Sequence, residues 1–277
     1  MLNIIKSDLY RLLKGKSLYI VIAVIIGLEV LSAVTISPGH IGISVAQESE
    51  MTDPAVIERI TNAKSLGEFR NIMKEISGVK LDKQILGQNI NMYYVFIVFV
   101  VVIITSDFSN RSVKNTLSSA ISRREYFLSK FLLALGVSAV LTLFNNYVSY
   151  GLNYFINGSG MASPVLEITK ISLYQMPLIF GLASLLVCIA FVVRKTSLFN
   201  TISIPLIMLV QIAMMVVFAI IRKTPEWYTD YEIQYAIANL AGDPTSAYIV
   251  KCCVLGLVYT VVFAVIGYCA FKKAEIK

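Results

Sequence analysis

Charged residues are scarce in this chain: they make up 15% of its 277 residues, whereas 57% are hydrophobic, and the mean hydropathy is +0.73. A water-soluble domain of this size needs a surface rich in charge, and so few charged side chains cannot supply one. The charges also lie between long apolar runs. In hydrocarbon each backbone amide must bond within its own segment, so the sequence predicts an all-α integral membrane protein.

Residues that build enzyme and metal sites are scarce too. The chain has one histidine, His40, and four cysteines, and all four cysteines fall within apolar runs, where small packing residues are common. No HExxH or GxSxG motif and no cluster of carboxylates with histidine is present. We therefore expect no catalytic site and no metal or cofactor bound by this chain. The cysteines are Cys188, Cys252, Cys253 and Cys269.

Long apolar runs divide the chain into six segments that can each cross a bilayer as a helix. The second is the shortest, because its apolar core is only Met92–Thr105, and the preceding residues extend it into the interface. We expect one transmembrane domain over residues 1–277. Its predicted spans are residues 18–36, 90–106, 126–150, 172–193, 198–221 and 252–271.

The net charge of +7 is unevenly distributed between the two sides that six spans define. One side carries 14 Lys and Arg residues against four acids, and the other carries 10 against 12 acids. Cytoplasmic loops are enriched in Lys and Arg, so both termini are predicted to be cytoplasmic. The basic excess indicates topology and an anionic lipid surface as the partner, and no nucleic acid is expected.

Residues 2–14 have the spacing of an amphipathic helix ahead of the first span. One face carries the apolar residues and the other is polar and basic, which suits a helix lying in the membrane interface. The alternative is a cytoplasmic extension of the first span. The apolar face consists of Leu2, Ile5, Leu9, Leu12 and Leu13, and the polar face of Asn3, Lys6, Tyr10, Arg11 and Lys14.

Two longer segments are predicted on the outer side. The loop at residues 37–89 contains cap signals for two short helices, including a capping box at Ser65–Glu68. Residues 222–251 combine clustered aromatics with Pro225 and Pro244. They fit either a re-entrant element or an ordinary belt of interfacial aromatics, and both remain open.

The loop between spans two and three carries the most specific pattern. Val113, Leu117, Ala120 and Ile121 recur at helical spacing, which predicts a short helix within 109–121. Ser122 and Glu125 then form a capping box that starts the next helix. Such a helix can lie parallel to the membrane and fit a groove in a soluble partner, oriented by its basic residues. A basic loop that merely follows the charge rule is the alternative.

This loop resembles the coupling region of ABC-2 type permeases, the membrane subunits of many bacterial ATP-binding-cassette exporters. In that family an acid closes span two, a helix with Gly, Ser or Thr follows, then a Ser-Arg pair and a Lys about seven residues on. Here Asp107, Ser112 to Thr116, Ser122-Arg123 and Lys130 match. Two departures are an Asp where Glu is frequent, and Arg111-Ser112 where a Gly is usual.

The resemblance implies a permease without a nucleotide site, paired with a separate ABC ATPase subunit that binds ATP and Mg. It also implies a location in the bacterial inner membrane and a second permease subunit, in a homodimer or a heterodimer. The residues expected to contact the ATPase lie in the coupling region, residues 107–125. They are Asp107, Arg111, Val113, Lys114, Leu117, Ile121, Ser122, Arg123 and Arg124.

Polar residues within the spans are candidates for a translocation path. Glu29 is the one acid in a span, and such an acid normally faces a cavity or pairs with a cation. The alternative is a tilted span that brings Glu29 near the outer interface. Asn145 and Gln211 join it as candidates, although hydrogen bonds between helices are the more favoured role for them and for Asn146.

The expected function is outward transport driven by the partner ATPase, and the substrate stays open. The amphipathic outer loop favours an amphipathic peptide or antimicrobial compound. A stand-alone secondary transporter would normally show two matching halves with several intramembrane charges, and neither is evident. A sensor or assembly subunit that uses the outer loop also remains open.

Overall fold

The computed structural model describes residues 2–35, 81–118, 121–157, 162–221, 228, 231–242 and 244–274. The two helices predicted within 37–80 lie outside these residues. The described part is helical throughout and contains no strand. Its helices are α1 (Leu2–Lys14), α2 (Lys16–Thr35), α5 (Leu81–Gly87), α6 (Met92–Val100), α7 (Ser106–Ser109), α8 (Ser112–Ser118), α9 (Arg123–Asn157), α10 (Val165–Val193), α11 (Thr196–Ile221), α13 (Ile233–Leu240) and α14 (Ser246–Lys272).

Five helical stretches in the described part are long and apolar enough to cross a membrane. The expected number was six, and the 20-residue helix α2, at the first predicted span, is not among the five. Each of the other five predicted spans lies within one of these stretches. They are Asn89–Ser109, Arg123–Phe155, Val165–Val193, Thr196–Ile221 and Ser246–Lys272.

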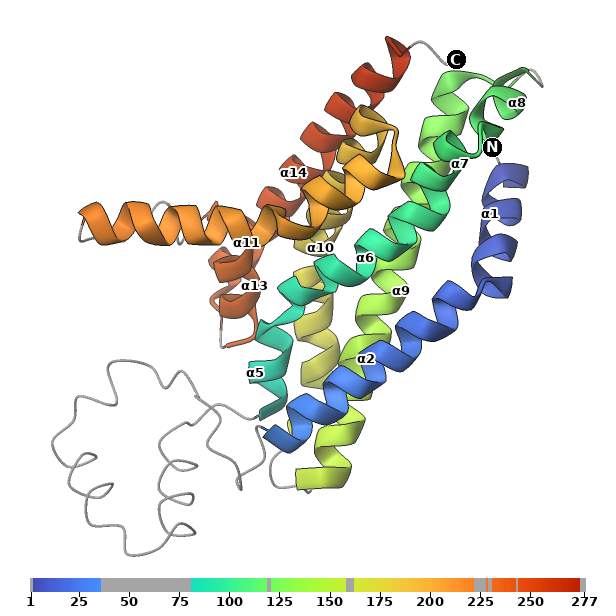
Figure 1. Ribbon diagram of the computed structural model, residues 1–277. Coiled ribbons are helices and arrows are strands. Elements are labelled where there is room, and N and C mark those ends of the chain that lie inside the picture. The colour runs from blue at the N-terminus through green and yellow to red at the C-terminus, as the bar shows by residue number, and fades with distance from the viewer. Residues whose placement is uncertain are drawn as a thin grey trace, which may run out of the picture.

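The helices form a bundle whose two ends differ (Figure 1). The N-terminus, α7, α8 and the start of α9 lie together at one end, which we call the α8 end. The short helices α5 and α13 pack on each other away from that end. Helix α13 lies within the segment 222–251 between the last two predicted spans; the chain turns after Leu240 and starts α14 at the capping residue Thr245.

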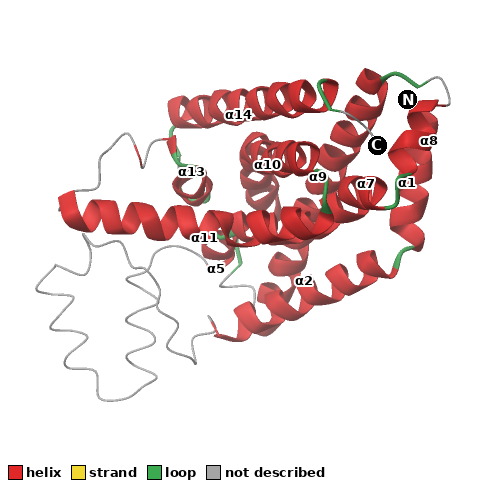
Figure 2. Ribbon diagram, turned by 45° about the horizontal axis from the view of Figure 1, so that its top comes forward, coloured by secondary structure: helices red, strands yellow, loops and turns green. Residues whose placement is uncertain are grey.

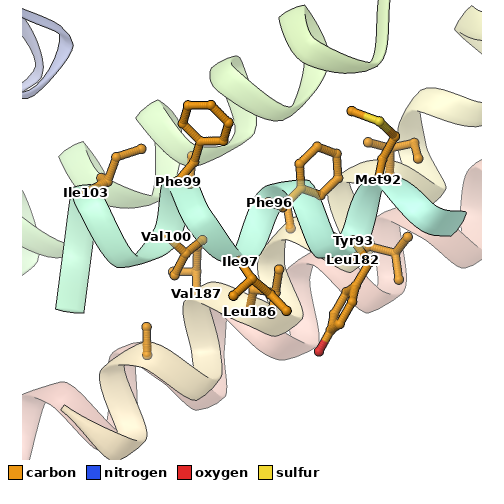
Figure 3. Packing of buried hydrophobic residues seen from close by; sticks show 14 of the residues in the cluster. Met92, Tyr93, Phe96, Ile97, Phe99, Val100, Ile103, Leu182, Leu186 and Val187 are labelled. Carbon is orange, nitrogen blue, oxygen red and sulfur yellow. The ribbon is translucent and has the colours of Figure 1, made fainter. Parts of the chain in front are cut away.

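Helix α10 is the centre of the bundle, with α6, α9, α11, α13 and α14 packed around it (Figure 2). Figure 3 shows the apolar face of α6 against one side of α10, where Leu182, Leu186 and Val187 lie. Most of the large side chains at this contact are fully buried. Helix α11, in contrast, leaves the bundle over much of its length, and apolar side chains such as Met215 and Ile220 are exposed there. That surface is suited to lipid or to a further membrane subunit.

Helices α10 and α14 approach most closely at Gly256. A methyl group at Gly256 would lie 2.3 Å from the Pro177 carbonyl carbon and 2.6 Å from the Leu178 nitrogen. Both atoms belong to the backbone, so the helices would have to separate, which costs about 1–3 kcal/mol. We predict that Gly256→Ala lowers the melting temperature of the purified chain.

The matched control is Gly136→Ala in α9, where an added methyl group meets nothing within 4 Å. Alanine is favoured over glycine in a helix by up to about 1 kcal/mol, so this variant should melt at the wild-type temperature or above it. Equal melting temperatures for the two alanine variants would contradict the close packing at Gly256.

Candidate functional site

At the α8 end, an irregular turn interrupts the helical stretch Asn89–Ser109. Residues Val101–Thr105 form a π-helical turn between α6 and α7. A π turn widens the helix and leaves carbonyl groups without their usual partners, and such turns are frequent at functional sites. Arg11 of α1 donates to two of these carbonyls, with Nη2 2.7 Å from the Val102 oxygen and 3.4 Å from the Ile103 oxygen. The turn therefore docks α1 and sets the position of Asp107.

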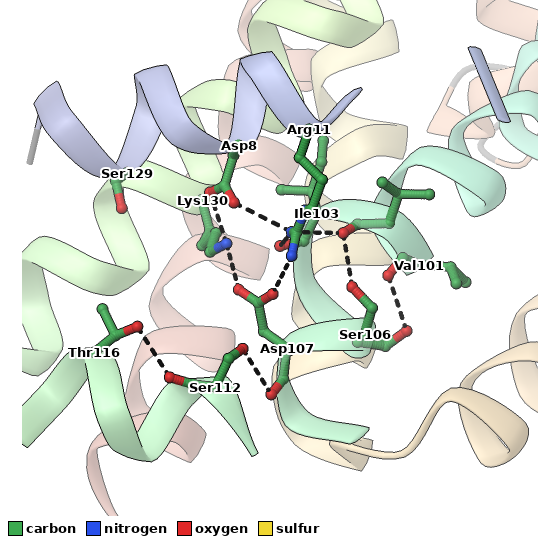
Figure 4. A network of polar contacts seen from close by, with 12 residues as sticks. Asp8, Arg11, Val101, Ile103, Ser106, Asp107, Ser112, Thr116, Ser129 and Lys130 are labelled. Carbon is green, nitrogen blue, oxygen red and sulfur yellow. Dashed lines mark hydrogen bonds and ion pairs between the residues drawn. The ribbon is translucent and has the colours of Figure 1, made fainter. Parts of the chain in front are cut away.

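Four charged side chains from α1, α7 and α9 meet beside this turn (Figure 4). The Lys130 ammonium lies between two carboxylates, with Nζ 2.6 Å from Asp8 Oδ2 and 2.5 Å from Asp107 Oδ2. The Arg11 guanidinium lies 2.6 Å from Asp107 Oδ1 and 3.1 Å from Asp8 Oδ1. We call Asp8, Arg11, Asp107 and Lys130 the charge cluster. It ties the N-terminal helix to the end of span two and the start of span three.

The charge cluster is electrically balanced, with two positive and two negative groups; the Arg11 side chain is 41% exposed, and the other three members are nearly sealed from solvent. The side chains of Lys130, Asp8 and Asp107 are 1%, 8% and 9% exposed. Burial raises the pKa of the Asp8 carboxyl, against the opposing effect of Lys130. The ionised form of Asp8 therefore depends on Lys130. Losing one partner of a buried pair is costly because the other charge stays buried.

An aromatic group supports the charge cluster from the side of α10 and α14. The Tyr126 hydroxyl donates to Asp107 Oδ2 at 3.0 Å, and its ring contacts Phe191 and Phe271. Phe108, next to Asp107, packs edge-on against the same two phenylalanines. These rings pack α7 against α9, α10 and α14. A displacement of α7 would therefore also displace side chains of these three long helices.

In the structure α8 covers Ser112–Ser118, within the predicted range 109–121. The chain turns sharply between α7 and α8, and Arg111 adopts φ of 58°, a left-handed conformation that favours glycine. Arg111 is one of the two residues, Arg111-Ser112, that stand where the family that this loop resembles usually carries a Gly. The Ser112 hydroxyl donates to the Asp107 carbonyl at 3.2 Å, which ties α8 to the charge cluster.

The predicted capping box at the start of α9 is confirmed. The Ser122 amide donates to Glu125 Oε2 at 3.1 Å, and the Glu125 amide donates to Ser122 Oγ at 3.2 Å. The next residue, Arg123, donates to the carbonyl oxygens of Phe271, Lys272 and Ala274 at distances of 3.2, 2.7 and 2.8 Å. Arg123 therefore joins the start of α9 to the end of α14.

The nine residues predicted to contact an ATPase differ in their exposure. Asp107 and Val113 are buried within the chain, and Arg123 is engaged with α14. Leu117 and Ile121 are partly buried and pack against the core. The remaining four are exposed and form what we call the basic surface of the α8 end: Arg111, Lys114, Ser122 and Arg124.

A family of membrane permeases matches most of the chain. The matching family model is described as the multidrug efflux system permease Rv1217c, C-terminal domain, and it covers residues 56–272. The chain belongs to this family. It is therefore a multi-pass membrane protein of a permease family. No curated protein matches the chain in a search of proteins with assigned functions.

The family match divides the charge cluster. Asp107 and Lys130 lie within the matched residues, whereas Asp8 and Arg11 belong to α1, which precedes them. Asp107 and Lys130 of the matched region thus form ion pairs with a guanidinium and a carboxylate from α1, which lies outside the match. Helix α1 has the bounds that its apolar spacing predicts, and its Leu2, Leu9 and Leu13 side chains are exposed.

The residues predicted for the translocation path do not all come together. Glu29 and Asn145 lie beside each other between α2 and α9. Gln211 is elsewhere, hydrogen-bonded to Gln234 of α13. The hydrogen bonds predicted between helices are confirmed, since Asn146 Nδ2 lies 2.9 Å from Ser172 Oγ and Asn145 Nδ2 lies 3.4 Å from Asn89 Oδ1.

Sequence reasoning missed that the charges of α1 are directed into the protein. From the sequence, Asp8 is only one of the four acids on the basic side, and Arg11 belongs to the polar face of the interfacial helix. A signal was present: Asp8 and Arg11 are three residues apart and therefore lie on one helix face, as an ion pair does. Lys130, the one charged residue of α9 beyond its first turn, is the residue that needed such partners.

Two substitutions at Arg111 distinguish the effect of its left-handed backbone conformation on stability from the effect of losing its side chain. A non-glycine residue in this conformation costs about 1–2 kcal/mol. We predict that Arg111→Gly leaves the melting temperature unchanged or raises it slightly, whereas Arg111→Val lowers it, because a branched side chain suits the left-handed region least. If both variants melt together, the turn does not have this conformation in solution.

Proposed function

We propose that the chain is the membrane subunit of an ATP-driven exporter of the ABC-2 type, working with a second permease subunit and a separate ATPase. The observation that carries this proposal is the α8 end. It offers an exposed basic surface around the short helix α8, and that helix is tied through Asp107 to the charge cluster. An acidic groove on a soluble ATPase would be a complementary partner for such a surface.

The coupling follows from these connections. A push on α8 is transmitted through the Ser112 bond to Asp107, and through Lys130 to α9, which runs for 35 residues. Arg123 passes the same displacement to the end of α14. Packed helices move as units, so closing of the ATPase would favour an outward-open arrangement of the bundle over an inward-open one.

The second permease subunit and the substrates are parts of the same proposal. The exposed apolar length of α11 is a surface on which another membrane subunit could pack. The description of the family as a multidrug efflux system permease favours lipophilic compounds of several kinds over the amphipathic peptide expected from the outer loop. ATP binding and hydrolysis would take place in the partner, with no step in this chain.

Everted membrane vesicles from cells that make the full exporter would test the proposal. We expect uptake of a lipophilic fluorescent dye when ATP is added, none with a non-hydrolysable analogue, and little effect of an uncoupler. Vesicles without the chain are the control. Uptake that needs the proton gradient and not ATP would instead identify a secondary transporter.

A further inference from the structure

Helix α9 carries a row of polar side chains through the middle of the bundle. At about 100° per residue, its six members fall within an arc of roughly 100° on one helix face. All six are buried, and most other residues in this stretch are apolar. We call this row the α9 polar stripe. It consists of Ser138, Thr142, Asn145, Asn146, Ser149 and Asn153.

Glu29 of α2 lies against this stripe, with Asn145 and Ser149 as its polar neighbours. One carboxylate oxygen, Oε2, is buried and has no hydrogen-bond partner. No Lys or Arg in the described part of the chain forms an ion pair with Glu29. An acid at this depth is normally paired with a cation or directed at a pathway for substrate or protons. The stripe thus has a negative group without a positive partner.

The stripe itself has further oxygens without partners. Thr142 Oγ1, Asn146 Oδ1 and Ser149 Oγ are buried and make no hydrogen bond, and their residues are 0%, 1% and 2% exposed. Together with Glu29 they supply four of the six such atoms among the described residues. Buried polar atoms are normally paired, so this concentration indicates a place where a ligand supplies the missing donors.

Neighbouring amides hold the stripe in position. Asn89 donates to Gln175 Oε1 at 2.7 Å, and Gln175 Nε2 donates to the carbonyl oxygens of Leu86 and Ile237 at 3.1 and 2.9 Å. Asn145 joins this group through Asn89. The amide side chains are therefore fixed by bonds to α5, α10 and α13 before any ligand is bound, as a preorganised site requires.

The chemistry of the free atoms selects a ligand with a positive charge and N–H donors. Glu29 Oε2 and Asn146 Oδ1 can only accept, and the Thr142 and Ser149 hydroxyls can accept or donate; the only charged atom is negative, so a cation is favoured over an anion. The free oxygens from Thr142 to Ser149 extend over about 10 Å of helix, so they cannot all bind one metal ion, whose ligands lie about 2–3 Å away. A protonated amine on a longer molecule can bind at Glu29 while the rest of that molecule extends past it.

The position of Glu29 indicates how such a molecule arrives. Its neighbours Leu28 and Leu31 are exposed, each at 58%, on the predominantly apolar 20-residue helix α2. The hydrocarbon part of an amphiphile can remain in lipid there while its ammonium group reaches the carboxylate. We propose that Glu29 and the α9 polar stripe bind the alkylammonium group of cationic amphiphiles, which, if the proposed export function holds, are a substrate class of this permease.

Binding to the purified full chain in lipid nanodiscs tests this without ATP or a partner. The probe is radiolabelled octylamine, with empty nanodiscs as the blank and octanol as a neutral competitor. We expect Glu29→Gln to lower octylamine affinity by about tenfold or more, since a charge-assisted hydrogen bond is lost. Glu167→Gln, at an acid paired with Lys83, is the matched control and should bind like the wild type.

The stripe is tested separately by Thr142→Val and Ser149→Ala, each expected to weaken binding about two- to tenfold. These variants decide the question if Glu29→Gln does not fold. Wild-type affinity in the stripe variants, or in a folded Glu29→Gln variant, would overturn the proposal. So would displacement of octylamine by sodium at equal strength, which would identify a metal-ion site instead. Because binding is measured without ATP, its loss is distinguishable from a failure of ATP-driven uptake.

Discussion

Lys130→Met is expected to destabilise the chain more than any other single replacement considered. It leaves Asp8 and Asp107 buried together with only Arg11 to balance them, and breaking a buried pair in this way costs about 3–5 kcal/mol. We expect a large fall in melting temperature, or loss of the folded peak in size-exclusion chromatography, for the detergent-purified variant.

Two variants sharpen this test. Asp8→Asn combined with Lys130→Met restores charge balance between Arg11 and Asp107, so it should recover much of the stability. Lys83→Met removes a lysine that forms an ion pair with the partly exposed Glu167. An exposed ion pair contributes about 1 kcal/mol at most to stability. A Lys130→Met chain that melts like the Lys83→Met chain would show that the charge cluster is not a structural element.

Reversing charge on the basic surface is expected to have the largest effect on partner binding. Lys114→Glu combined with Arg124→Glu changes two exposed side chains and leaves the buried charge cluster untouched. Like charges brought together at an interface cost several kcal/mol, so ATPase affinity should fall at least about tenfold. The measurement is a titration of the purified ATPase onto the immobilised permease at two salt concentrations.

The matched control makes the same change of charge on α1. Lys6→Glu combined with Lys14→Glu also reverses two exposed lysines. It should keep ATPase affinity near the wild-type value and should melt at the same temperature. Equal losses of affinity in both double variants would mean that binding responds to net charge alone, without a docking site at α8.

The positions of the long helices were predictable from hydropathy, but their lengths were not. Helix α9 has 35 residues and so is about 50 Å long, whereas the hydrocarbon core is about 30 Å thick. Hydropathy detects only the part inside the bilayer. The capping box at Ser122 predicts the start of α9, and the structure confirms it.

The location of the coupling region in the chain was predictable from the sequence, but its three-dimensional arrangement was not. Its apolar ridge was expected to face a partner, yet Val113 is buried within the chain, because the sharp turn at Arg111 folds α8 back onto α7. The π-helical turn at Val101–Thr105 has no sequence signature. The charge cluster joins residues 8, 107 and 130, and no local pattern relates positions so far apart.

The most direct test of the central proposal is purification of the tagged chain in mild detergent, with identification of any co-purifying protein and an assay of ATP hydrolysis. We predict a stoichiometric ATPase that accompanies the wild type and is lost from the Lys114→Glu, Arg124→Glu chain. A chain that purifies alone, or only with itself, and hydrolyses no ATP would contradict the exporter proposal.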